Sequence, residues 1–154
     1  MEIIVKEGRI ENLSSIYEIE VECFGEEAFP RAMIEYAVRS SGNSKTYIAF
    51  FGDKPVGFII GRIYRDRDKP VGVIYTLDVK ADFRRRGIGT RLLHTLENAF
   101  LKDGAELCRL EVSIKNIEAL NLYMKFGYKK IRVLHNYYGR GHDGILLEKR
   151  LKQE

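Results

Sequence analysis

A basic, glycine-containing segment between an apolar run and a helical pattern constrains this chain more than any other feature. The segment Arg84-Arg85-Arg86-Gly87-Ile88-Gly89-Thr90 follows the apolar run Val73–Val79. Apolar residues then recur at helical spacing: Leu92, Leu93, Leu96, Ala99 and Phe100. A strand that enters a helix through such a loop presents unpaired backbone N–H groups at the positive end of the helix dipole. Gly87 and Gly89 have no Cβ, so an anion can approach the backbone closely. The segment therefore predicts a pyrophosphate site.

The spacing of this segment excludes two common nucleotide loops. The pattern Arg-x-x-Gly-x-Gly lacks the Gly-x-Gly-x-x-Gly spacing of dinucleotide-binding loops. It also lacks the Lys-Ser/Thr ending of the Walker loop. A plain helix start with solvated arginines remains the alternative.

Composition indicates one globular domain that covers residues 1–154. The chain has 154 residues, of which 45% are hydrophobic and 31% charged. No apolar run reaches the roughly 18 residues needed to span a bilayer, and the N-terminus has no signal-peptide pattern. Cys23 and Cys108 are isolated, without metal-ligand spacing, and are expected to be reduced thiols. We therefore expect a cytoplasmic protein without a membrane segment or a metal.

The charge distribution argues against a nucleic-acid-binding protein. The net charge is only +4, and no zinc-finger, RRM or KH signature is present. Positive residues gather in three places: Lys80–Arg91, Lys129–Arg132 and Lys149–Lys152. An anionic cofactor accounts for the first cluster better than DNA does.

Periodicity predicts a mixed α/β sheet. Strands are expected at residues 3–6, 46–51, 55–64, 71–79, 107–114, 128–133 and 144–150, with a charged tip at 65–69. Helices are expected at residues 12–22 with Asn12 as N-cap, from Pro30 to about 39, and at 87–102 and 117–126. Two strand–helix–strand crossovers favour parallel pairing in the second half, and the hairpin favours antiparallel pairing in the first.

The basic segment resembles the acetyl-coenzyme A signature of the GNAT N-acetyltransferases, most closely in the RimI/Ard1 group that acetylates protein N-termini. The resemblance continues at the family's distances: Leu110-Glu111-Val112, Asn116, Ala119–Tyr123, Phe126-Gly127-Tyr128 and Asn136-Tyr137-Tyr138. It implies a single-domain GNAT fold with helices on both faces of the sheet and splayed parallel strands that form the cofactor cleft.

The resemblance implies which residues bind acetyl-CoA. The amides of the basic segment would hold the pyrophosphate, with charge from its arginines: Arg84, Arg85, Arg86, Gly87, Ile88, Gly89 and Thr90. The backbone of Leu77-Asp78-Val79 would pair with the pantetheine arm, and Asn116 would hydrogen-bond the cofactor. An ordinary core strand and a helix N-cap are the structural alternatives.

Two residues match the family's catalytic positions. Glu111 would take the proton of the incoming amine, directly or through a water. Tyr123 would face the thioester and protonate the departing thiolate. A solvent-facing carboxylate and a tyrosine of the helix core are the alternatives.

Three further residues match substrate-binding loops of the family: Glu27, Tyr137 and Tyr138. The two loops would form a short slot for an extended peptide end. In relatives an acidic stretch follows the two tyrosines, whereas this chain has Arg140 and His142, which are expected to favour an acidic or neutral second residue.

Together these features predict direct acetyl transfer from acetyl-CoA to a protein α-amine, without a metal. A homo-oligomer or an auxiliary subunit is compatible with the sequence. Acetylation of lysine side chains or small amines remains the alternative activity, and a non-catalytic acyl-CoA-binding module the alternative class.

Overall fold

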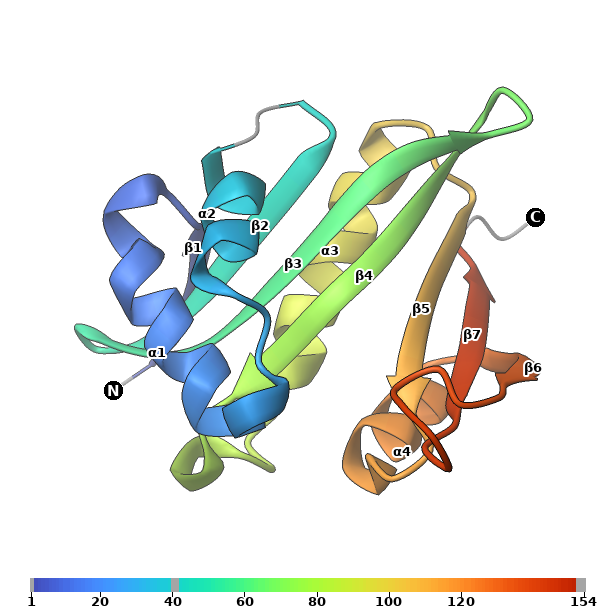
Figure 1. Ribbon diagram of the computed structural model, residues 1–154. Coiled ribbons are helices and arrows are strands. Elements are labelled where there is room, and N and C mark those ends of the chain that lie inside the picture. The colour runs from blue at the N-terminus through green and yellow to red at the C-terminus, as the bar shows by residue number, and fades with distance from the viewer. Residues whose placement is uncertain (1, 40–41, 152–154) are drawn as a thin grey trace. The chain divides into compact units, whose positions relative to one another are not determined.

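The computed structural model describes residues 2–39 and 42–151, which fold into strands and helices of an α/β protein (Figure 1). The strands are β1 (Ile3–Glu7), β2 (Ser44–Phe51), β3 (Lys54–Asp66), β4 (Lys69–Val79), β5 (Leu107–Ser113), β6 (Lys129–Leu134) and β7 (Gly144–Arg150). The α-helices are α1 (Leu13–Phe24), α2 (Arg31–Arg39), α3 (Ile88–Lys102) and α4 (Ile117–Lys125). Short 3-10 turns are η1 (Ile10–Asn12), η2 (Gly25–Glu27) and η3 (Ala81–Phe83). The mixed α/β class predicted from the sequence is confirmed.

The strands are hydrogen-bonded in the order β1-β2-β3-β4-β5-β7-β6. The chain divides into two compact units, and β3 and β4 supply residues to both. The first unit contains residues Met1–Arg62 and Tyr75–Ala99, and the second contains Ile63–Ile74 and Phe100–Glu154.

Helices cover both faces of the strands in the first unit (Figure 1). The core on one face joins α1 and α2 to β2 and β3 through Leu13, Ile16, Ile19, Ile34, Ile48, Phe58 and Ile60. Side chains alternate along a strand, so Gly57 faces the opposite side from Phe58. A Cβ at Gly57 would lie 3.4 Å from Leu92 of α3, which places α3 on that opposite face.

The second unit differs from the predicted strand pairing. β4 and β5 are parallel from Val71↔Leu107 to Ile74↔Leu110, as expected. β5 and β6 are not neighbours, however, because β7 lies between them and is antiparallel to both. The physical reason is burial: Ile145 and Leu147 of β7 are 6% and 0% exposed. β6 begins with exposed basic residues that suit the edge of a sheet.

Two local predictions also need correction. The charged tip is shorter than residues 65–69, because the strands continue to Asp66 and resume at Lys69. Arg67 and Asp68 both adopt positive φ, at 53° and 67°, as a tight two-residue hairpin turn requires. Asn12 does precede α1, but its Oδ1 accepts the N–H of Arg9 at 2.9 Å and does not cap that helix.

No helix within residues 2–39 and 42–151 has the length and apolar character needed to cross a membrane.

Candidate functional site

The basic loop before α3 has the backbone of an anion-binding turn. α3 begins at Ile88, and the carbonyl of Gly87 accepts the first helical hydrogen bond, from Arg91 N–H at 3.1 Å. Arg85 and Gly87 have positive φ, at 63° and 81°. Left-handed residues in a loop can turn neighbouring N–H groups toward one side of the chain. A Cβ built at Gly87 meets nothing within 4 Å, so the backbone there is open to a ligand.

Arg85 adopts a conformation that an L-residue with a Cβ takes at a cost of about 1 kcal/mol. Such backbone strain is concentrated at ligand-binding and active sites. Residues 84–87 are exposed, whereas Ile88 is 1% exposed and anchors the start of the helix in the core. The loop is thus held at its helical end and accessible along the rest.

The arginines of this loop differ in their contacts. Arg84 donates from Nε to the carbonyl of Val79 at 2.9 Å. The guanidinium of Arg86 lies over the ring of Phe83, 5.0 Å from its centroid. Arg84 therefore ties the loop to the end of β4 as well as supplying positive charge.

At the end of β4, a backbone carbonyl that the sequence analysis left available for the cofactor already accepts hydrogen bonds from side chains. The Val79 carbonyl accepts from Arg84 and also from the Cys23 thiol, at 3.6 Å. Asp78 is 1% exposed. Pairing of a pantetheine arm with residues 77–79 would thus use backbone groups other than the Val79 carbonyl.

Glu27, the substrate-side candidate of the first unit, is exposed at the end of η2.

In the second unit, β5 presents Glu111 to solvent. Leu110 and Val112 are 3% and 6% exposed, whereas Glu111 is exposed, as strand alternation predicts. Tyr137 donates from its hydroxyl to Glu111 Oε1 at 2.5 Å. This hydrogen bond, together with burial, raises the pKa of Tyr137 to about 12. The base candidate and one substrate-side candidate therefore meet directly, although they lie 26 residues apart in the sequence.

The loop after β6 is fastened to β5 at a second point. His142 Nε2 and Ser113 Oγ share a hydrogen bond of 2.5 Å. The ring of Tyr138 lies 5.3 Å from that of His142 and 5.0 Å from that of Tyr137. His142 consequently supports the tyrosine pair, a role that sequence reasoning missed when it counted this residue only as a lost acid.

Tyr123 and Asn116 both have structural roles on α4. Tyr123 is 4% exposed, and its ring packs edge-on against Tyr128 with centroids 5.3 Å apart. Asn116 is the N-cap of α4 and accepts the Ala119 N–H through Oδ1 at 3.1 Å. The cap uses the side-chain oxygen and not the amide nitrogen, so capping and cofactor binding are compatible.

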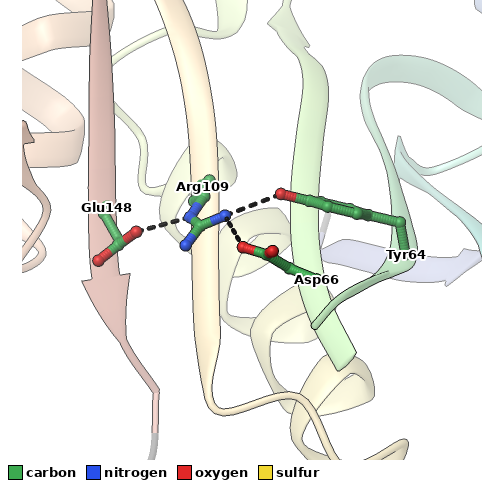
Figure 2. Close-up of polar contacts among 4 residues, drawn as sticks. All are labelled: Tyr64, Asp66, Arg109 and Glu148. Atoms are coloured by element: carbon green, nitrogen blue, oxygen red, sulfur yellow. Dashed lines mark hydrogen bonds and ion pairs between the residues drawn. The ribbon is translucent and has the colours of Figure 1, made fainter. Parts of the chain in front are cut away.

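Figure 2 shows an ion-pair network around Arg109 that sequence analysis did not find. Arg109 donates from Nε to Glu148 Oε2 at 2.6 Å. Its Nη1 donates to Asp66 Oδ2 at 3.0 Å and to Tyr64 Oη at 2.9 Å. Arg109 and Glu148 are register partners on β5 and β7. The network fixes the strand that carries Glu111, and only the folded pairing reveals it.

In the parts of the chain that the structure describes, no group of three His, Cys, Asp or Glu side chains is placed to hold a metal ion.

The chain matches a known protein family and named relatives. Residues 13–128 match the family described as Acetyltransferase (GNAT) family. An uncharacterized N-acetyltransferase of Methanocaldococcus jannaschii is 33% identical over 96% of this chain and 92% of its own length. N-alpha-acetyltransferase 50 of Danio rerio is 36% identical over 68% of this chain and 64% of its own.

Among solved structures, Arabidopsis thaliana Naa50 in complex with the bisubstrate analogue CoA-Ac-MVNAL superposes with a TM-score of 0.84. The match covers 97% of this chain and 99% of that one, at 24% sequence identity. At this identity the likeness shows the fold.

The open space at Gly87 generates a test. Gly87→Ala should weaken coenzyme A binding at least about tenfold, equal to ~1.4 kcal/mol, because the new Cβ projects where the anion would approach. Gly42→Ala is the matched control: Gly42 has a φ of 80° and also meets nothing within 4 Å. Both variants should lose similar stability in urea. Equal coenzyme A affinities by calorimetry would contradict this placement.

Proposed function

Because the chain belongs to the acetyltransferase (GNAT) family, we propose that the acetyl group it transfers from acetyl-CoA goes to the α-amino group of protein N-termini. The observation that carries the proposal is the hydrogen bond from Tyr137 to Glu111. It joins a carboxylate able to accept an amine proton to the tyrosine pair that resembles a peptide-binding loop. The relationship to N-alpha-acetyltransferase 50 supports the same choice.

The basic loop suits the pyrophosphate of acetyl-CoA. Its left-handed residues Arg85 and Gly87, and the open space around Gly87, leave backbone N–H groups that an anion can approach. In the proposed assignment, the amides of residues 85–90 bind the phosphates and Arg84–Arg86 supply charge. The backbone of residues 77–79 binds the pantetheine arm. Asn116 donates a hydrogen bond to the cofactor. Acetyl-CoA supplies an already activated thioester.

The proposed reaction is a direct transfer. The amine nitrogen attacks the thioester carbonyl, a C–N bond forms, and the C–S bond breaks to release the coenzyme A thiolate. Glu111 accepts the proton that the amine loses, and Tyr123 donates a proton to the thiolate. Tyr137 donates a hydrogen bond to the ionised Glu111. Because its pKa is raised to about 12, Tyr137 stays protonated over the whole working range.

The acidity of the acceptor favours an α-amine. An α-amino group has a pKa of about 7.7–8.0, whereas that of a lysine side chain is about 10.4. Near neutral pH a much larger fraction of the α-amine is therefore neutral and nucleophilic. A single exposed carboxylate such as Glu111 suffices as its base.

Peptide binding is assigned to Tyr137 and Tyr138 in the second unit and to Glu27 in the first. The tyrosine side chains are 49% and 40% exposed, which leaves ring surface for a peptide. Arg140 is exposed on the same loop, whereas His142 is engaged with Ser113. We therefore assign the preference for an acidic or neutral second residue chiefly to Arg140.

The substrate assignment can be tested with peptides. Free N-terminal peptides should be acetylated at least about tenfold faster than peptides with blocked N-termini and an internal lysine, given the amine acidities. Product mapping by mass spectrometry identifies the acetylated nitrogen. Equal rates for both peptide sets would favour the lysine or small-amine activity. Absence of turnover with intact acetyl-CoA binding would favour the non-catalytic alternative.

The catalytic roles make a second prediction. Glu111→Gln and Tyr123→Phe should each lower kcat by roughly 10²-fold, as expected for a lost general base or acid. Coenzyme A affinity should remain near that of the unmodified protein. Tyr128→Phe is the matched control for Tyr123, because it removes one hydroxyl from the partner ring of the same buried pair. If both catalytic variants keep full kcat between about pH 6 and pH 9, the roles are wrongly assigned.

The Tyr137 contact makes a third prediction. Tyr137→Phe removes the hydroxyl that donates to Glu111 Oε1 and so orients the carboxylate. The kcat for an N-terminal peptide should fall roughly tenfold, the loss expected for one hydrogen bond to a charged group of about 1.5 kcal/mol. Tyr138→Phe, which changes the neighbouring ring in the same way, should leave kcat nearly unchanged. A loss of equal size in both variants would mean that the contact has no specific part in catalysis.

A further inference from the structure

A buried polar cluster in the first unit takes no part in the proposed chemistry. It contains Glu20 of α1 and Thr76 and Asp78 of β4, which are 1%, 7% and 1% exposed. Thr76 Oγ1 lies 3.1 Å from Glu20 Oε1 and 2.5 Å from Asp78 Oδ1. Two carboxyl groups are therefore bridged by one hydroxyl in the interior.

The geometry of this bridge requires a carboxyl proton. A threonine hydroxyl has one hydrogen, so Thr76 can donate to only one of the two acids. For the other contact to be a hydrogen bond, that acid must carry a proton and donate it to Thr76 Oγ1. Two charged carboxylates in one dry site would also repel each other. Burial, followed by the contact with Glu20, raises the pKa of Asp78 well above its ordinary value.

Glu20 also holds the loop that follows α1. Its second oxygen, Oε2, accepts the backbone N–H of Phe29 at 2.9 Å. Phe29 lies two residues after Glu27, the substrate-side candidate, and one residue before Pro30, whose carbonyl accepts the first hydrogen bonds of α2. One carboxyl group thus fastens the Gly25–Pro30 loop to the interior.

Two other titratable groups lie near the cluster, Arg84 and Cys23, and neither removes the need for a carboxyl proton. Arg84, from the basic loop, favours ionised Asp78, but this effect is smaller than that of burial, and its Nε is engaged by the Val79 carbonyl. Cys23 lies one helical turn after Glu20. Burial, then the charge of Asp78, raises the pKa of the Cys23 thiol to about 11, so the thiol stays neutral. Asp78 itself must hold the proton.

We propose that Asp78 holds a proton that it donates to Thr76 Oγ1, so that the Thr76 hydroxyl donates to Glu20, and that this arrangement makes Glu20 a positioning residue for the Gly25–Pro30 loop and so for peptide binding. The part that concerns the peptide rests on the proposed function. When the proton is lost, two adjacent buried carboxylates repel each other and Glu20 turns away from Thr76. Phe29 then loses its acceptor, and the loop that carries Glu27 is no longer held.

The first test is hydrogen exchange at the Phe29 amide, measured by NMR as a protection factor between about pH 5 and pH 9, the range in which buried carboxyl groups titrate. Protection in the unmodified protein should fall at least about tenfold as the pH rises. Glu20→Gln should retain protection throughout, because its Oε1 accepts from Phe29 and its Nε2 donates to Thr76 Oγ1, which leaves the Thr76 hydroxyl to donate to Asp78. Glu18→Gln, an exposed change on the same helix, should behave as the unmodified protein.

Thermal stability provides a second, independent readout. A group whose pKa is raised by folding contributes stability at low pH that is lost as pH rises toward the raised pKa. The Tm of the unmodified protein should therefore fall with rising pH, and that of Glu20→Gln should fall less. A Phe29 protection factor that is independent of pH, or one that Glu20→Gln lowers even at pH ~5, would overturn the assignment of a proton to Asp78.

Peptide kinetics separate this inference from the proposed function. In the unmodified protein the KM for an N-terminal peptide should rise over the same pH range as Phe29 protection falls, while in Glu20→Gln it should stay nearly constant. A change in kcat alone, with constant KM, would overturn the positioning role. If no peptide is acetylated but Phe29 behaves as described, the proposed substrate is wrong and the proton-dependent loop remains.

Discussion

The alternation of side chains along β5 is the constraint on which the candidate site depends. Because Leu110 and Val112 are buried in the core, Arg109, Glu111 and Ser113 must all face the other side of the sheet. Each meets a partner from a distant part of the second unit: Glu148, Asp66 and Tyr64, then Tyr137, then His142. Glu111 itself does not contact the core. Its position is set by the burial of its two neighbours, Leu110 and Val112.

In the first unit, two residues of α1, Glu20 and Cys23, make polar contacts with other elements. Glu20 reaches Thr76 and the Phe29 amide, and Cys23, one turn later, donates to the Val79 carbonyl that also binds Arg84. The helix thus contacts both the Gly25–Pro30 loop and the strand end beside the basic loop. The contacts of Glu20 and Cys23 are buried or half-buried, where a hydrogen bond is electrostatically stronger than it is in water.

Much of the fold could be predicted because it follows from local rules. Apolar periodicity located the strands and helices to within a few residues, and Gly104, with a φ of 90°, follows the end of α3. The errors concern pairing and side-chain partners. The chain order of β6 and β7 does not say which of them is the edge strand. The residue types do give a signal, because β7 carries the apolar Ile145 and Leu147 whereas β6 begins with basic residues. The Asn12 side chain could accept either an N–H of α1 or the preceding N–H of Arg9, and the local sequence does not decide between them.

The sequence by itself determined the basic glycine loop, the alternation that exposes Glu111, and the family to which these motifs belong, since each depends on residues close together in the chain. Only the tertiary structure decided which side chains meet. Tyr137 and Glu111 are 26 residues apart, Arg109 and Glu148 are 39 apart, and Glu20 and Thr76 are 56 apart. No local pattern encodes such contacts, because they arise when strands pair and a helix packs. The burial that then removes water also decides where a carboxyl group keeps its proton.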